Sequence, residues 1–183
     1  SDKKVSSVIN GKSIYSEEVV WHPKLSEDSS YQYEGILSSL KTAASKLPKV
    51  DAIGISAAGI YINNEIKLSS LFIKIPDDEF ENKVKRMFFD IAKEMGNIPF
   101  EVANDGDVTA LAGAMSLNQG NILGIAMGTS EAAGYVDNNG CLKGWLNELA
   151  FVPIDYNEKA MQDEWSGDIG CGVKYFSQDG VIK

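Results

Sequence analysis

Cysteine and histidine are scarce in this chain of 183 residues, which contains only Cys141, Cys171 and His22. The two cysteines lie far apart and form no CxxC motif, so a scaffold held by disulfides is not expected. The default compartment for such a chain is the reducing cytoplasm. A structural zinc site needs about four ligands, and the supply of cysteine and histidine is thin.

Long apolar runs and basic clusters are also missing. The sequence has no apolar run of about 18 residues, so it predicts no transmembrane helix, and its start does not resemble a signal peptide. Lysine and arginine number 17 against 26 acidic residues, which gives a net charge of −9. This balance disfavours binding to nucleic acid and to anionic membranes. Hydrophobic residues, at 44%, suffice for a packed core.

The first part of the chain reads as strands and helices in alternation. Two extended stretches flank Asn10-Gly11, a dipeptide typical of a β-hairpin turn. Three helices and two strands are then expected, the first two helices from their apolar period. In chain order, they are a helix over 31–47, a strand over 50–56, a helix over 80–95, a strand over 100–103 and a helix over 105–117.

A second α/β unit is predicted to begin near residue 118. The pattern changes there from helices to a strand pair over 121–128 and 132–136. We therefore expect a first lobe over 1–118 and a second over 119–183. The segment over 145–177 has little periodicity.

Polar residues follow the strand over 100–103 at its carboxyl end. Asn104 and Asp105 are good helix caps, so a purely structural role is one interpretation. The other is that Asp105 faces a substrate, because open α/β sheets bind ligands at the carboxyl ends of their strands. A carboxylate there could accept a proton from a substrate hydroxyl.

Three further positions have both a structural and a functional interpretation. The turn Gly128-Thr129-Ser130 offers backbone amides and hydroxyls to an anion, or is a plain hairpin turn. Gly59 ends a buried strand, either as a tight loop or as a ligand-facing one. Glu148 is either a solvated surface carboxylate or part of a site.

The ordered set of motifs resembles the ROK family of repressors and sugar kinases. The stretches that carry the resemblance are IGISAAG, IPFEVANDGDVTALAGA, GIAMGTSEAAGYVDNNG, NELAFVPID and GCGVKYFSQ. The resemblance implies the actin-like ATPase fold, of ribonuclease H-like α/β lobes with mixed sheets flanked by helices. It also implies an ATP-dependent phosphotransferase that uses Mg²⁺ and acts on a hydroxyl of a sugar or sugar-like small molecule.

The resemblance also implies roles for individual residues. Asp105 falls on the catalytic base of the family, and Asn104, Gly59 and Glu148 on substrate-binding positions. The phosphate-binding loop falls on Gly128, Thr129 and Ser130.

The chain departs from the family pattern at several positions. Phe151 replaces a histidine that binds sugar and zinc, and Val173 replaces a sugar-contacting glutamate, so no zinc is expected. Ser130 and Ala132 replace loop glycines. We also expect a fragment of the family fold, without its first strand and without the C-terminal half of its second lobe.

Two functions of different classes remain open. The first is a sugar kinase of the ROK type. The second is a non-catalytic sugar-sensing or regulatory protein on the same scaffold. The oligomeric state is open as well, with a homodimer as one alternative.

Overall fold

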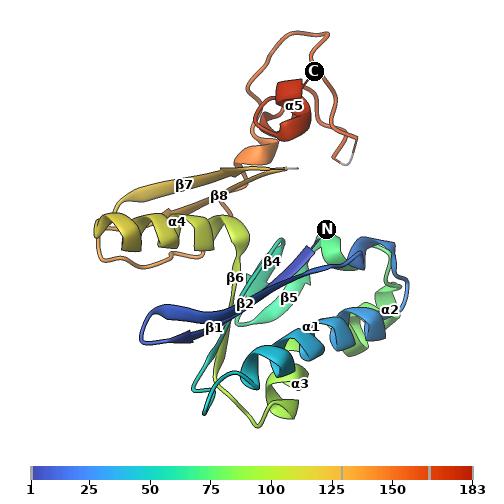
Figure 1. Ribbon diagram of the computed structural model, residues 1–183. Helices are drawn as coiled ribbons and strands as arrows, with labels where there is room; N and C mark the ends of the chain where they lie inside the picture. Colours follow the sequence, from blue (N-terminus) through green and yellow to red (C-terminus); the bar gives the residue numbers. More distant parts are fainter. Residues whose placement is uncertain (1, 129, 165, 183) are drawn as a thin grey trace. The chain divides into compact units, whose positions relative to one another are not determined.

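The computed structural model describes residues 2–128, 130–164 and 166–182. Contacts divide the chain between Val102 and Ala103 into two compact units, unit 1 and unit 2 (Figure 1). This division lies earlier than the lobe boundary expected near residue 118. It differs because helix α4 (Asp105–Leu117) packs on strands of unit 2. The extent of the lobes in a complete two-lobed fold stays a prediction.

Unit 1 begins with the predicted hairpin. Strands β1 (Asp2–Ile9) and β2 (Lys12–Val20) are antiparallel, with a bulge between Ser7 and Val8. The turn residues Asn10 and Gly11 both have positive φ, at 50° and 75°. A type I′ hairpin turn requires that conformation at both central positions, which explains why Asn-Gly predicted it.

The helices of unit 1 begin with α1 (Ser29–Ala44), where the Asp28 side chain accepts a hydrogen bond from the Ser30 N–H at 2.9 Å. The second helical region is less regular than predicted. It consists of α2 (Asp77–Glu79), a wide π-turn (Phe80–Val84) and α3 (Met87–Glu94). The apolar period indicated the buried face of this region correctly, but it did not indicate the π-turn that interrupts the regular α-helical hydrogen bonds.

Two further strand pairs complete unit 1. Strand β3 (Ile53–Ala57) pairs with β6 (Phe100–Asn104), and β4 (Ile60–Ile62) pairs with β5 (Glu65–Leu68). Asn64, in the β4–β5 turn, donates to the Phe100 carbonyl at 3.2 Å and accepts from the Val102 N–H at 3.0 Å. These bonds attach the β4–β5 hairpin to β6.

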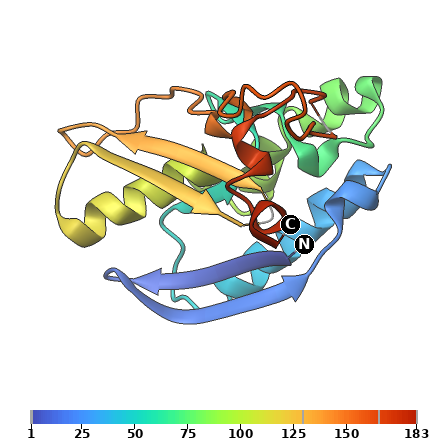
Figure 2. The ribbon, with the colours of Figure 1, turned by 90° about the horizontal axis from the view of Figure 1, so that it is seen from above.

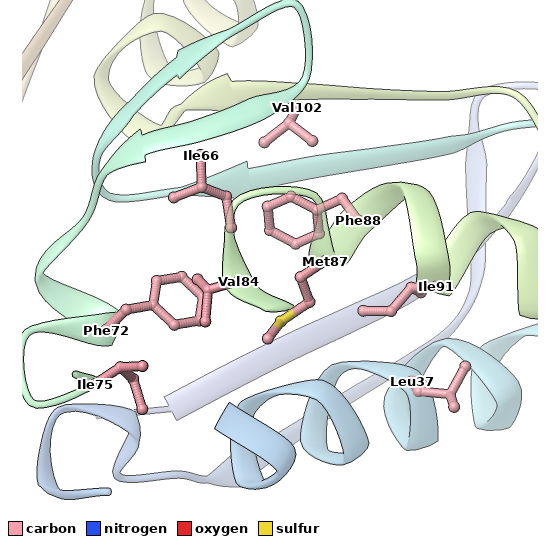
Figure 3. Packing of buried hydrophobic residues seen from close by; sticks show 9 residues of the cluster. All are labelled: Leu37, Ile66, Phe72, Ile75, Val84, Met87, Phe88, Ile91 and Val102. Carbon is pink, nitrogen blue, oxygen red and sulfur yellow. The ribbon is translucent and has the colours of Figure 1, made fainter. Parts of the chain in front are cut away.

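The core of unit 1 lies between its helices and these short strands. Figure 3 shows the side chains of Met87, Phe88 and Ile91 on α3 pointing toward residues of the strands and of α1. All three are at most 2% exposed. The cluster consists of Leu37, Ile66, Phe72, Ile75, Val84, Met87, Phe88, Ile91 and Val102.

Unit 2 is built on one hairpin and one long helix. Strands β7 (Ile122–Met127) and β8 (Glu131–Val136) are antiparallel, and α4 lies along them (Figures 1 and 2). After β8 the chain forms short turns: two 3₁₀ turns, η4 (Leu149–Phe151) and η5 (Gly172–Lys174), and the short helix α5 (Gln178–Ile182). Every helix in the described residues is too short or too polar to cross a membrane.

Candidate functional site

The first candidate residues lie where β6 gives way to α4. Asn104 is the N-cap of α4, and its Oδ1 accepts a hydrogen bond from the Gly106 N–H at 2.8 Å. Its extended backbone, with φ −59° and ψ 145°, is typical of an N-cap residue. The sequence allowed either Asn104 or Asp105 to cap the helix, and in the structure Asn104 is the cap.

Asp105 is the first residue of α4 rather than its cap. The side chain is half-buried, and Oδ1 accepts from the Gly106 N–H at the longer distance of 3.2 Å. Because Asn104 already caps the helix, the carboxylate of Asp105 is not required for the cap.

The helix start is held against β8 by glycine. A Cβ on Gly106 would lie 2.6 Å from the carbonyl carbon of Ala133, and one on Gly134 would collide with the backbone of Gly106 and Asp107. Only residues without a side chain permit so close an approach of helix and strand. The position of Asp105 relative to the hairpin is therefore set by direct backbone packing.

Glu148 lies in the same unit and interacts electrostatically with Asp105. Partial desolvation raises the pKa of Glu148, and the negative charge of Asp105 raises it further. Two carboxylates that interact in this way form a pair of acceptors for hydroxyl or cationic donors. Unit 2 thus brings together two of the residues that the sequence singled out.

Two residues that the sequence analysis did not single out support this pair. Asn147, next to Glu148, has a left-handed backbone with φ 50°, and its Nδ2 donates to Asp107 Oδ1 at 3.4 Å. Desolvation raises the pKa of Asp107, although the side chain of Asn147 and the backbone N–H of Tyr135 donate to it. The loop that carries Glu148 is thereby attached to the first turn of α4. The sequence signal was weak, because Asp107 is one of several acidic residues and Asn147 stands in an aperiodic stretch.

The predicted phosphate loop joins β7 to β8. The Gly128 N–H donates to the Ser130 carbonyl at 2.9 Å, and the Gly128 carbonyl accepts from the Gln178 N–H at 2.8 Å. A Cβ on Gly128 would meet nothing closer than the Ser130 carbonyl at 4.0 Å, so the space above it is open, and Ser130 is exposed. Thr129 lies outside the described residues. The N–H of Gly128 thus takes part in the hairpin turn, and its carbonyl bonds to the first residue of α5.

Gly59, the remaining candidate, belongs to unit 1. Its φ is 135°, and a Cβ there would lie 2.7 Å from Ser69 Cβ and would collide with the Leu68 carbonyl. The preceding carbonyl, of Ala58, accepts from Ser69 Oγ at 2.6 Å and from the Tyr61 hydroxyl at 3.0 Å. Packing inside unit 1 is sufficient to require glycine at this position.

Phe151, which stands where the family resemblance implies a zinc-binding histidine, has no donor atom for a metal ion. Phe151 lies in η4, and Cys171 is buried, which raises the pKa of its thiol. Within residues 2–128, 130–164 and 166–182, no group of three or more histidine, cysteine, aspartate or glutamate side chains could hold a metal ion. The expectation that the chain binds no zinc stays a prediction.

Solved structures with the same arrangement of elements belong to ROK family proteins. A ROK family glucokinase from Streptomyces griseus, in complex with glucose and AMPPNP, matches 98% of this chain with a TM-score of 0.70 and 18% identity. A ROK family transcriptional regulator, a homologue of the E. coli MLC protein, matches 99% with a TM-score of 0.68 and 17% identity. An inorganic polyphosphate/ATP-glucomannokinase from an Arthrobacter species matches 99% with a TM-score of 0.62 and 16% identity.

These matches confirm the predicted fold class, a mixed α/β fold of the ROK, actin-like ATPase type. The chain spans 55% of the glucokinase, 45% of the regulator and 66% of the glucomannokinase. No protein-family model matches the sequence, and no curated protein is significantly similar to it. The likeness to ROK proteins is therefore one of fold.

Proposed function

We propose that this chain carries the acceptor-binding part of a ROK-type kinase that transfers a phosphoryl group from ATP to a hydroxyl of a sugar or sugar-like molecule. The observation that carries the proposal is the position of Asp105 and its interaction with Glu148. The Asp105 carboxylate stands at the start of α4, it is not required for the helix cap, and it interacts with the charge of Glu148.

In this proposal Asp105 is the general base. It accepts the proton of the attacking hydroxyl as the new oxygen–phosphorus bond forms, which a positioned carboxylate does efficiently. Asn104 and Glu148 hold neighbouring hydroxyls of the acceptor, and the substrate-binding role that the family resemblance implies for Gly59 stays a prediction. The packing of Gly106 against Ala133 keeps Asp105 in place without movement of the helix.

The donor side would consist of Gly128, Thr129 and Ser130. The open space above Gly128 fits the approach of a phosphate oxygen. Because the Gly128 N–H already donates to Ser130, the Ser130 hydroxyl is the described group that would donate to the phosphates. Bound ATP supplies the phosphoryl group, and Mg²⁺ would be held mostly by phosphate oxygens and water, as is usual for this ion.

A non-catalytic, sugar-sensing protein is the second candidate. One of the structural relatives is a transcriptional regulator. In addition, Glu131 follows the phosphate loop directly and is buried. A carboxylate so close to the loop in sequence is an unfavourable neighbour for phosphate, and this favours the regulator.

The two candidates differ in sugar-dependent ATP consumption. We would measure ADP release by the natural full-length protein with a panel of hexoses, amino sugars and disaccharides, and sugar binding by calorimetry. The kinase proposal predicts that at least one sugar that binds also raises ADP release above the sugar-free rate. Sugars that bind without any increase would contradict the kinase and support the regulator.

A further inference from the structure

The two faces of the β7–β8 hairpin have different surroundings. Gly124 and Gly134 are paired across the hairpin, and both approach the backbone of α4 closely. Side chains alternate along a strand, so Ile125, Met127 and Glu131 belong to the opposite face. That face is only partly covered by the chain that follows β8.

A pocket of about 310 Å³ lies on this opposite face. Its volume is at the lower end of the range of small-molecule sites. The wall is apolar, with residues from β7, from the segment that contains η4, and from the end of the chain. Its apolar lining includes Ile125, Met127, Leu149, Val152, Ile154 and Phe176.

Among the residues that the structure describes, Glu131 is the one ionisable side chain that lines the pocket. The residue is only 7% exposed, and its Oε2 is buried without a hydrogen-bond partner in the described part of the chain. Met127 is its cross-strand partner, and a Cβ on Gly172 would lie 2.7 Å from the same Oε2. Desolvation raises the pKa of Glu131, which agrees with an apolar environment for the carboxylate.

A buried carboxylate without a partner is costly, because it loses water and gains no compensating bond. A ligand that brings a cationic donor to Oε2 would offset that cost with a charge-assisted hydrogen bond. Phosphates and carboxylates would be repelled. A sugar would leave most of its hydroxyls unpaired against the apolar wall.

We propose that this pocket is a second ligand site, which binds a small organic amine with its ammonium group on Glu131 and its apolar body against Ile125, Val152 and Phe176. The pocket volume of about 310 Å³ is within the range of small-molecule sites, so a small organic amine fits. None of the lining residues is among those proposed to bind the acceptor, and the proposal does not depend on kinase activity.

Three probes of nearly equal size test the charge requirement. Phenethylamine carries the cation, phenethyl alcohol replaces it with a neutral hydroxyl, and hydrocinnamate carries an anion. Binding to the full chain is followed by amide chemical shifts in nuclear magnetic resonance spectra. We expect phenethylamine to bind with shifts at Ile125, Met127 and Phe176, at least about tenfold more tightly than the alcohol. Hydrocinnamate is expected not to bind.

Glu131→Gln keeps the shape of the side chain and removes its charge. We expect this variant to bind phenethylamine at least about tenfold more weakly, down to the affinity of the alcohol. Glu158→Gln, at an exposed carboxylate of the same unit, is the matched control and should bind like the unmodified chain. Glu131→Met supplies a second, apolar variant if the glutamine variant is poorly folded, and it too should lose the preference for the amine.

Three results of the binding series would overturn the proposal even if phenethylamine binds. They are equal affinity for the amine and the alcohol, undiminished binding in both Glu131 variants, and shifts that fall outside the pocket residues. Absence of phenethylamine binding at millimolar concentration would also refute it, and would indicate that this apolar face serves protein packing.

Discussion

Gly106 and Gly113 lie on the same helix, α4, yet a methyl group added to each should have opposite effects on stability. At Gly106 the new Cβ would lie 2.6 Å from the Ala133 carbonyl carbon and 2.7 Å from the Ala133 nitrogen. Real Cβ contacts under 3.0 Å essentially do not occur, and backbone atoms cannot rotate away. Helix and strand must therefore separate. At Gly113 the Cβ would meet Ile122 Cγ2 at 3.5 Å, an ordinary contact.

The magnitudes follow from these two surroundings. Overpacking of a tight contact typically costs about 1–3 kcal/mol. Alanine in a helix interior gains about 0.5–1 kcal/mol over glycine, because less backbone entropy is lost on folding. We therefore expect Gly106→Ala to destabilise the chain by about 1–3 kcal/mol and Gly113→Ala to stabilise it by about 0.5–1 kcal/mol.

Urea unfolding of the two variants, followed by far-ultraviolet circular dichroism, measures the difference. The midpoint should fall for Gly106→Ala and rise for Gly113→Ala, with unchanged slopes, since the surface exposed on unfolding is the same. A Gly106→Ala variant as stable as Gly113→Ala would refute the close approach of α4 to β8. The placement of Asp105 that depends on this approach would then fail as well.

Three further outcomes test other parts of the structure. A thiol reagent should label Cys141, which is exposed, rapidly in the native chain, and Cys171 only after unfolding, because burial protects it and raises its pKa; two rapidly labelled thiols would contradict this. Burial raises the pKa of Glu131 above the usual 4.5, so the ionised form of Glu131 destabilises the fold. The stability of the unmodified chain relative to Glu131→Gln should therefore decrease as the pH rises through that raised pKa. A stability difference that does not change with pH would contradict this expectation. The Lys143 side chain lowers the pKa of Asp137, and so do the backbone amides of its turn. The stability that Asp137 contributes should therefore be present above pH 3.8 and lost as the pH falls through the lowered pKa. In a pH series of thermal melts, Asp137→Asn should remove that part of the acid transition.

Local chemistry made several elements predictable from the sequence. Asn10-Gly11 and Asn63-Asn64 stand at hairpin turns because asparagine and glycine tolerate the positive φ that these turns need. The helix that starts at Asp105 was predicted from its cap and its composition, and its first residue is placed as expected. In such cases the signal is contained within a few consecutive residues.

Features that depend on distant contacts were not predictable in the same way. The wide turn over Phe80–Val84 interrupts a helix whose apolar period is regular. The contact that joins Asn147 to Asp107 spans 40 residues and leaves no periodic trace. Glu131 lies on the same face of the hairpin as Ile125 and Met127. This could have indicated a buried carboxylate, but only once the pairing register of the hairpin was known.

The central claim, that Asp105 is a catalytic base, is tested most directly by single-turnover phosphoryl transfer in Asp105→Asn. Asparagine keeps the shape of the side chain, and Asn104 still caps α4, so folding and the binding of nucleotide and sugar should be unchanged. Glu158→Gln, an exposed carboxylate of the same unit, is the control for charge removal and should transfer at the normal rate. We expect a loss of about 100- to 10,000-fold in the rate for Asp105→Asn, as is typical when a general base is removed. Transfer at the unmodified rate in that variant would contradict the claim and leave Asp105 as no more than the first residue of a helix.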